Sequence, residues 1–160
     1  MPQQVLEGVP VTLLHGASLC MLVRAQDLGI SGEEMPDQLN SDRGFLARVA
    51  ALREAAAEPL GRPNTAASPF VVILAGQSPD LTVRVIGLGR CHPALAATIA
   101  INLALATGLR DTLAYGPCLQ LRLHHPTGVM EVEAGVRIGY YRTARLLMRG
   151  EIYVPSSSRA

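Results

Sequence analysis

Residues 94–109 have the sequence ALAATIAINLALATGL, which carries no charged side chain and no polar stripe. A helix on the surface of a domain normally shows a polar face along one side. Because this stretch shows none, we expect a buried helix over about 93–108, covered by other elements on all sides. The stretch is shorter than the roughly 20 residues that a membrane span needs. The sequence therefore predicts a core helix and no membrane segment.

The residues just before this helix, GLGRCHP at 87–93, form its predicted N-terminal end. Pro93 suits the first helical position, and His92 suits the N-cap. The free amides of a first helical turn and the helix dipole favour the binding of a carboxylate or phosphate. The positively charged guanidinium of Arg90 can donate further hydrogen bonds to the same anion. Cys91, at the same place, can have a lowered pKa and be reactive. We therefore predict an anion site at Arg90, Cys91 and His92.

Short β-type runs lie before and after the predicted core helix. The first two runs can either pair or form one bent strand. The predicted strands cover 9–14, 19–25, 70–74, 81–86, 119–123, 129–132, 136–141 and 151–154. The last four strands follow one another closely, with turns at 127–128 and 134–135, and such short connections favour antiparallel pairing. The predicted fold class is α+β, a largely antiparallel, curved β-sheet wrapped around the buried helix.

A second helix is predicted on the surface over about 42–58. The sequence Asn40-Ser41-Asp42 is typical of a helix start. After it, five apolar residues fall on one helical face: Phe45, Leu46, Val49, Leu52 and Ala56. This spacing indicates an amphipathic helix with one buried side.

The sequence His124-His125-Pro126-Thr127-Gly128 lies between two predicted strands. A turn here brings imidazole, hydroxyl and amide groups together at a sheet end, where they can hold a carboxylate or relay a proton. A plain polar hairpin turn explains the same residues equally well. Both interpretations stay open at this point.

The composition of the chain indicates how many domains it forms and excludes some kinds of partner. With 160 residues, 49% of them apolar, the chain fits one domain. The net charge is +1, and the 14 basic residues are scattered arginines with no lysine, so nucleic acid is not an expected partner. No signal peptide is visible at the N-terminus.

The three cysteines show no disulfide framework and fit a reducing cytoplasmic location. Packing as small apolar groups is the simplest role for Cys20 and Cys118. No cysteine or histidine spacing typical of a zinc site is present, so we expect no bound metal.

Taken together, several segments resemble the PrpF-type isomerases, which have the diaminopimelate-epimerase fold. HPTGVMEV at 125–132 and RTARLLMRGEIYVP at 142–155 resemble the C-terminal signature of that family. Residues 11–23 resemble a conserved strand, 28–60 a helical region, and 89–92 the start of a helix. The resemblance covers 1–155 as a single C-terminal lobe and leaves 156–160 as a disordered tail.

The resemblance implies a two-lobed enzyme in which each lobe is a sheet curled around a central helix, with the active site between the lobes. Family members isomerise unsaturated di- and tricarboxylates such as methylaconitate, methylitaconate or oxalomesaconate, without cofactor or metal. A lysine and a cysteine of the first lobe transfer the proton. The second lobe contributes the helix N-terminus with its histidine, which corresponds here to His92.

The chain departs from the family in length and in several residues. It is about half as long, and it has no lysine. His15 stands where the family has Asp, Ser18-Leu19 where it has Asn-Pro, Cys91 where it has Pro, and Thr127 where it has Ser.

Two hypotheses follow. In the first, the chain is one lobe of an isomerase, completed by a first-lobe polypeptide or a homodimeric partner. Its substrate-binding residues are then Arg90, Cys91, His92, His125, Thr127 and Gly128. Ser18 also belongs to this set, and its departure from the family pattern weakens substrate binding at that position. In the second, the chain is an inactive truncated fragment or a carboxylate-binding module.

Overall fold

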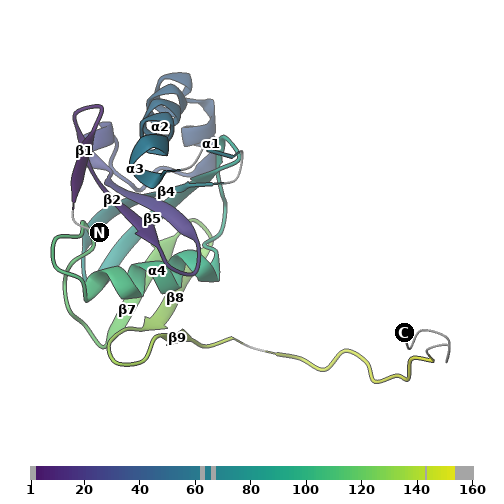
Figure 1. Ribbon diagram of the computed structural model, residues 1–160. Coiled ribbons are helices and arrows are strands. Elements are labelled where there is room, and N and C mark those ends of the chain that lie inside the picture. Colours follow the sequence, from purple (N-terminus) through teal and green to yellow (C-terminus); the bar gives the residue numbers. More distant parts are fainter. Residues whose placement is uncertain (1–2, 62–63, 66–67, 143, 154–160) are drawn as a thin grey trace.

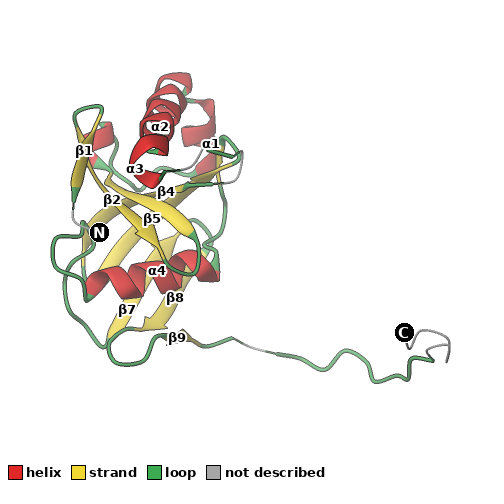
Figure 2. Cartoon of the chain, in the orientation of Figure 1, coloured by secondary structure: helices red, strands yellow, loops and turns green. Residues whose placement is uncertain are grey.

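The computed structural model describes residues 3–61, 64–65, 68–142 and 144–153. Figures 1 and 2 show a single curved sheet with helices on both sides. The strands are β1 (Gln4–Leu6), β2 (Val9–His15), β3 (Leu19–Arg24), β4 (Phe70–Gln77), β5 (Asp80–Gly87), β6 (Arg90–Cys91), β7 (Gln120–His125), β8 (Gly128–Glu133) and β9 (Gly139–Tyr140). The helices are the short 3-10 turn η1 (Gln26–Leu28), α1 (Pro36–Ser41), α2 (Arg43–Ala55), α3 (Ala57–Leu60) and α4 (Ala97–Thr107).

The strands follow the order β1-β2-β3-β4-β5-β7-β8-β9, and β6 pairs with the far end of β5. The pairs β3–β4 and β5–β7 are parallel, and the other pairs are antiparallel. The predicted α+β class with a largely antiparallel sheet is therefore confirmed. The first two predicted strands form an antiparallel pair, with Leu14 opposite Cys20.

The sheet divides the apolar side chains into two cores, because successive residues of a strand point to opposite faces. Leu22, Val72 and Val83 face α4. Met21 and Ile73 face the opposite core, which Phe45 of α2 fills. Figure 1 shows α1, α2 and α3 on one side of the sheet and α4 on the other. Since α4 contacts β2 at one end of the sheet and β8 and β9 at the other, the sheet wraps around it.

Helix α4 begins later than the sequence predicts. His92 does not cap it and Pro93 is not its first residue, because the helix starts at Ala97 with Ala96 as N-cap. The physical reason is a long-range hydrogen bond: the His92 amide donates to the Val85 carbonyl at 2.8 Å, which keeps residue 92 on the edge of β5. Residues 93–96 then cross to the helix without regular structure.

The helix is also not covered on all sides. Ile99 and Leu103 are fully buried, whereas Leu105 and Leu109, just beyond the helix, are 41% and 47% exposed. The expectation of complete burial is thus wrong for one face of α4. That face is an apolar strip without a covering element in the described part of the chain.

The predicted surface helix over 42–58 is broken into α2 and α3 and is preceded by α1. The Asp42 side chain caps α2 by accepting a hydrogen bond from the Phe45 amide at 2.8 Å. Pro59 has no amide to continue the helix, which explains why α2 ends at Ala55. The predicted buried face is confirmed for Phe45, Val49, Leu52 and Ala56, and Leu46 is partly buried.

The C-terminal strands differ most from the prediction. Only Gly139–Tyr140 of the expected strand over 136–141 pairs with β8. Residues 151–153 form no strand, and residue 154 lies outside the described residues, as does the predicted tail over 156–160.

Candidate functional site

His92 lies at the sheet edge, on the way from β6 to α4. Its ring packs edge-on against Phe70, with centroids 6.4 Å apart. Its Nε2 atom is buried and has no hydrogen-bond partner. A side chain at Gly87 would place its Cβ 2.6 Å from the Phe70 ring and 3.0 Å from His92 Nε2, so glycine is needed there. The site thus presents a buried imidazole nitrogen that lacks a partner, which is uncommon in folded proteins.

The N-terminus of α4 follows four residues after His92. The amides of Ile99 and Ala100 donate to the Ala96 carbonyl, and no side chain caps the helix. Ala97 and Thr98 therefore carry the amides of the first turn that have no partner within the helix. These amides and the helix dipole favour an anion, as the sequence predicts, although His92 is not itself part of the helix.

Arg90 lies in β6, opposite Gly87. The hairpin between β5 and β6 turns through Leu88 and Gly89, whose φ angles are 53° and 73°. Two successive positive φ angles are typical of a tight type I′ hairpin turn. The Arg90 side chain is exposed beside this turn.

Cys91 points away from His92, into the core on the α1 and α2 side. Its backbone is held by Asn40, which accepts from the Cys91 amide at 2.7 Å and donates to its carbonyl at 3.4 Å. Burial raises the pKa of the Cys91 thiol, and the charge of Arg84 offsets this only in part. The expectation of a lowered pKa is therefore wrong, because the thiol packs among apolar side chains. Cys91 and His92 lie on opposite faces of the sheet.

His125 and Thr127 come together at the predicted turn between β7 and β8. The Thr127 hydroxyl lies 3.1 Å from His125 Nδ1, and Gly128, with φ 148°, begins β8. Burial, and after it the charge of Arg84, lowers the pKa of His125, which favours the neutral imidazole. The side chain lines a pocket of about 440 Å³ together with Met130 and Tyr141.

The two histidine segments approach the same edge of β5. Strand β7 pairs with the start of β5 as far as Thr82 opposite His124. The His92 amide bonds to Val85 on the edge that β6 also uses. The backbones at His92 and His125 are thus separated only by the middle of β5. The structure brings these two predicted site segments to one sheet edge.

His124 has a different environment from His125. Its Nε2 lies 3.4 Å from Asp80, which also accepts a 2.7 Å bond from Arg122. All three side chains are on an exposed surface. His124 therefore belongs to a surface ion pair.

Ser18 lies in the turn between β2 and β3, which is hydrogen-bonded to Asn102 in the middle of α4. The Ser18 carbonyl accepts from Asn102 Nδ2 at 2.7 Å, and the Ala17 amide donates to Asn102 Oδ1 at 2.8 Å. Asn102 is only 1% exposed. The lone asparagine of the apolar helix is the sequence signal for this link, and our sequence reasoning did not use it.

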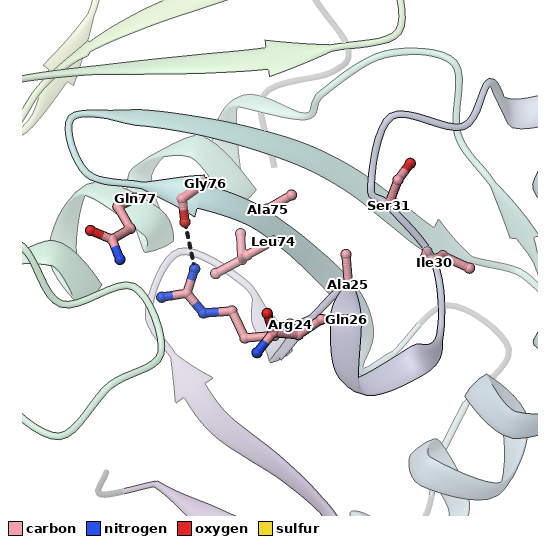
Figure 3. A pocket seen from close by; sticks show the side chains of 9 residues that line it. All are labelled: Arg24, Ala25, Gln26, Ile30, Ser31, Leu74, Ala75, Gly76 and Gln77. Atoms are coloured by element: carbon pink, nitrogen blue, oxygen red, sulfur yellow. Dashed lines mark hydrogen bonds between the residues drawn. The ribbon is translucent and has the colours of Figure 1, made fainter.

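A polar pocket of about 590 Å³ lies at the opposite end of β4 from Phe70. Figure 3 shows its lining, including Arg24, Gln26, Ser31 and Gln77. Arg24 donates to the Gly76 carbonyl at 2.7 Å across this pocket. The sequence contains no motif that predicts it.

Within the described ranges, no group of three or more His, Cys, Asp or Glu side chains is placed to hold a metal ion. Over the same ranges, no helix is both long enough and apolar enough to span a membrane.

Comparison with known proteins identifies the fold and the relatives. Residues 3–155 match the sequence model of the PrpF protein family. The chain is 31% identical over 168 residues to a (4E)-oxalomesaconate Δ-isomerase of a Novosphingobium species, covering 94% of this chain and 47% of that protein. It is 27% identical to a 2-methyl-aconitate isomerase of Shewanella oneidensis, covering 90% and 45%. The chain therefore spans about half the length of the curated relatives it matches.

A crystal structure of methylitaconate Δ-isomerase superposes with a TM-score of 0.80 at 22% identity, over 96% of this chain and 50% of that one. The diaminopimelate-epimerase-like fold expected from the resemblance is confirmed by this match.

Proposed function

The chain belongs to the PrpF family, and on this basis we propose that it forms the second lobe of a two-lobed isomerase. The substrates are small unsaturated di- or tricarboxylates, in keeping with the names of the relatives. The active site lies between this lobe and a first lobe. The free thiols of all three cysteines fit a reducing cytoplasmic compartment.

The observation that carries the proposal is the buried, unpartnered Nε2 of His92. A buried polar atom without a partner costs free energy, which a bound carboxylate recovers by forming the missing hydrogen bond. The free amides at Ala97 and Thr98 follow shortly along the chain and also favour an anion. Arg90 adds a positive charge at the neighbouring turn. We propose that these groups bind one carboxylate of the substrate.

The reaction moves a proton and a carbon–carbon double bond within one molecule. It needs a base that removes an allylic proton, an acid that returns it, and donors that stabilise the enolate-like negative charge. The backbone amides at the start of α4 and the side chains of Arg90 and His92 can stabilise this negative charge. No cofactor is needed for this stabilisation. We propose that His125, which contacts Thr127 and whose pKa is lowered by burial, contributes to the substrate cleft together with the backbone of Gly128.

The proton-removing base is assigned to the first lobe. The chain has no lysine, and the Cys91 thiol is buried with a raised pKa. The same two observations favour the second candidate function, a carboxylate-binding module without activity of its own. Both candidates use the His92 site, and they differ in whether a first lobe restores proton transfer.

The test measures isomerisation and solvent proton exchange. Purified chain is incubated with methylaconitate or trans-aconitate in deuterium oxide, alone and together with the half of the Shewanella relative that this chain does not match. Double-bond absorbance and deuterium incorporation are followed. We expect exchange only in the mixture, and loss of exchange when the mixture contains His92→Ala.

His15→Ala is the matched control, because His15 is an exposed histidine at the far end of β2. It should leave exchange unchanged. Absence of exchange in every mixture, with carboxylate binding intact, would favour the binding module. Exchange that is equal in wild type and His92→Ala would refute the proposed site.

A further inference from the structure

The Asn40 side chain reaches from α1 to the strand that leads to His92. Its Oδ1 atom accepts a hydrogen bond from the Cys91 amide at 2.7 Å, and its Nδ2 atom donates to the Cys91 carbonyl at 3.4 Å. One side-chain amide therefore satisfies both backbone groups of Cys91. In the sequence Asn40 is part of a predicted helix start, whereas in the structure it lies in the last turn of α1.

These two bonds hold the outer edge of β6. In an antiparallel pair, the backbone groups of successive residues point alternately toward the partner strand and away from it. The His92 amide donates to the Val85 carbonyl at 2.8 Å, so the backbone groups of Cys91 point away from β5. Asn40 takes the place that a further strand would otherwise occupy. The backbone at 91–92 is thus bonded on both sides, to β5 and to α1.

Helix α1 is itself fixed to β5, which makes Asn40 a firm support. Just before the helix, the carbonyls of Glu33 and Glu34 accept hydrogen bonds from Arg84 at 3.0 and 2.6 Å. Arg84 belongs to β5 and is only 6% exposed. Hydrogen bonds from a charged donor are among the stronger ones in proteins. Removal of the Asn40 amide should therefore loosen β6 rather than α1.

The imidazole of His92 has little room to adjust if its backbone moves. The ring packs edge-on against Phe70, with ring centroids 6.4 Å apart. Its Nε2 atom lies so close to Gly87 that a Cβ added to this glycine would be 3.0 Å away. A shift of the backbone at residue 92 consequently displaces Nε2 as well.

We propose that Asn40 is a positioning residue for His92. It acts through the backbone of Cys91 and determines where the imidazole lies, without contacting a ligand itself. This inference rests on the proposed function, in which His92 binds a substrate carboxylate. Loss of the Asn40 amide should leave the imidazole in the protein but out of place for that carboxylate.

The first test measures the environment of His92 without a ligand. The chain has four histidines, so NMR can resolve their ring signals, and His92→Ala identifies the signal of His92. We expect Asn40→Ala to shift and broaden this signal. Asn40→Leu removes both hydrogen bonds but keeps a side chain of similar size, and it should have the same effect.

Asp42→Ala is the matched control for a general loss of stability. It removes the N-cap of α2, where the Asp42 side chain accepts a hydrogen bond from the Phe45 amide at 2.8 Å. Loss of such a cap destabilises a protein by about 1 kcal/mol. Because Asp42 makes no hydrogen bond to β6 among the described residues, this variant should leave the His92 signal unchanged.

The second test is the binding of trans-aconitate, measured by isothermal titration. Asn40→Ala should weaken binding about tenfold, whereas Asp42→Ala should not change it. In the His92→Ala protein, adding Asn40→Ala should weaken binding by less than about twofold, because the group that Asn40 positions is already absent. A merely structural role of Asn40 would instead give the same loss of affinity with and without His92.

An unchanged His92 signal in Asn40→Ala would overturn the proposal. So would a wild-type signal in Asn40→Leu, an equal change in Asp42→Ala, or equal losses of affinity with and without His92. Failure of the proposed function gives a different pattern, because the wild type and His92→Ala then show the same affinity. In that case the ring signal of His92 still decides whether Asn40 positions the imidazole.

Discussion

At the scale of single residues, the chemistry of each site group depends on which face of the sheet it reaches. His92 and Cys91 are adjacent in sequence, but one lies beside Phe70 and the other in the core under α1. The histidine keeps an unsatisfied nitrogen, whereas the cysteine becomes an apolar packing group. Successive side chains of an extended segment point to opposite faces of the sheet, and this is enough to give the two neighbours different roles.

The environment of Cys91 predicts low thiol reactivity. Cys91 is 2% exposed, and burial raises its pKa, so little thiolate is available at neutral pH. Cys118 is partly exposed. We expect a thiol reagent to label Cys118 at least tenfold faster than Cys91 in the folded protein, and both at similar rates in urea. Peptide mapping by mass spectrometry measures this order, and faster labelling of Cys91 would contradict the structure.

Asp80 predicts a pH dependence of stability. The hydrogen bond from Arg122, and more weakly that from His124, holds the pKa of Asp80 below its usual range. In the unfolded chain this carboxyl binds protons more readily, at about pH 4. The stabilisation is therefore present above about pH 4 and is lost as the pH falls through the folded pKa.

Asp80→Asn should consequently lower the thermal midpoint at neutral pH and have a smaller effect at acid pH. Arg122→Gln should give the same flattened profile. Thermal unfolding followed by circular dichroism across the acid range provides the comparison. A destabilisation that is constant with pH would show that the ion pair does not contribute.

At the scale of elements, Asn102 connects the core helix to the sheet. Its amide group satisfies the Ala17 amide and the Ser18 carbonyl in the turn between β2 and β3. Gly16 passes so close that an added Cβ would lie 2.4 Å from Asn102 Oδ1. The hairpin is thus fixed to α4 by one buried polar side chain.

Asn102→Ala should therefore destabilise the protein by about 3 kcal/mol, since two hydrogen bonds are lost and their backbone partners stay buried. Thr98→Ala, on the exposed side of the same helix, should change stability by less than about 0.5 kcal/mol. Urea unfolding of both variants tests this difference. Equal unfolding midpoints would indicate that the turn relaxes and finds water.

The helices and strands also show how much of the fold the sequence patterns predict. Apolar periodicity located α4, α2 and most strands, because it records which face is buried. The start of α4 was misplaced, since a hydrogen bond from His92 to Val85 outweighs the local signals of a helix start. Likewise, nothing near Arg84 in the sequence predicts its burial, which depends on bonds to the carbonyls of Glu33 and Glu34.

At the scale of the whole molecule, the sheet with its central helix forms one lobe, in which three features lack a partner among the described residues. These features are the buried His92 Nε2 atom, the exposed apolar side chains Leu105 and Leu109, and the exposed apolar side chains of residues 146–153. Near the C-terminus a strand was predicted over 151–154, whereas the described residues 151–153 form none. Of the expectations for the candidate site, the reactive thiol of Cys91 is contradicted by its burial, and the substrate-binding roles of His92, His125 and Ser18 stay predictions.

The central claim is that the His92 site binds a substrate carboxylate. Isothermal titration of the purified chain with trans-aconitate tests it most directly, since every group of the proposed His92 site belongs to this chain. A charge-assisted hydrogen bond of about 1.5–3 kcal/mol predicts that His92→Ala binds at least tenfold more weakly, with His15→Ala unchanged. Equal affinity of all three proteins, or no binding by the wild type, would contradict the account.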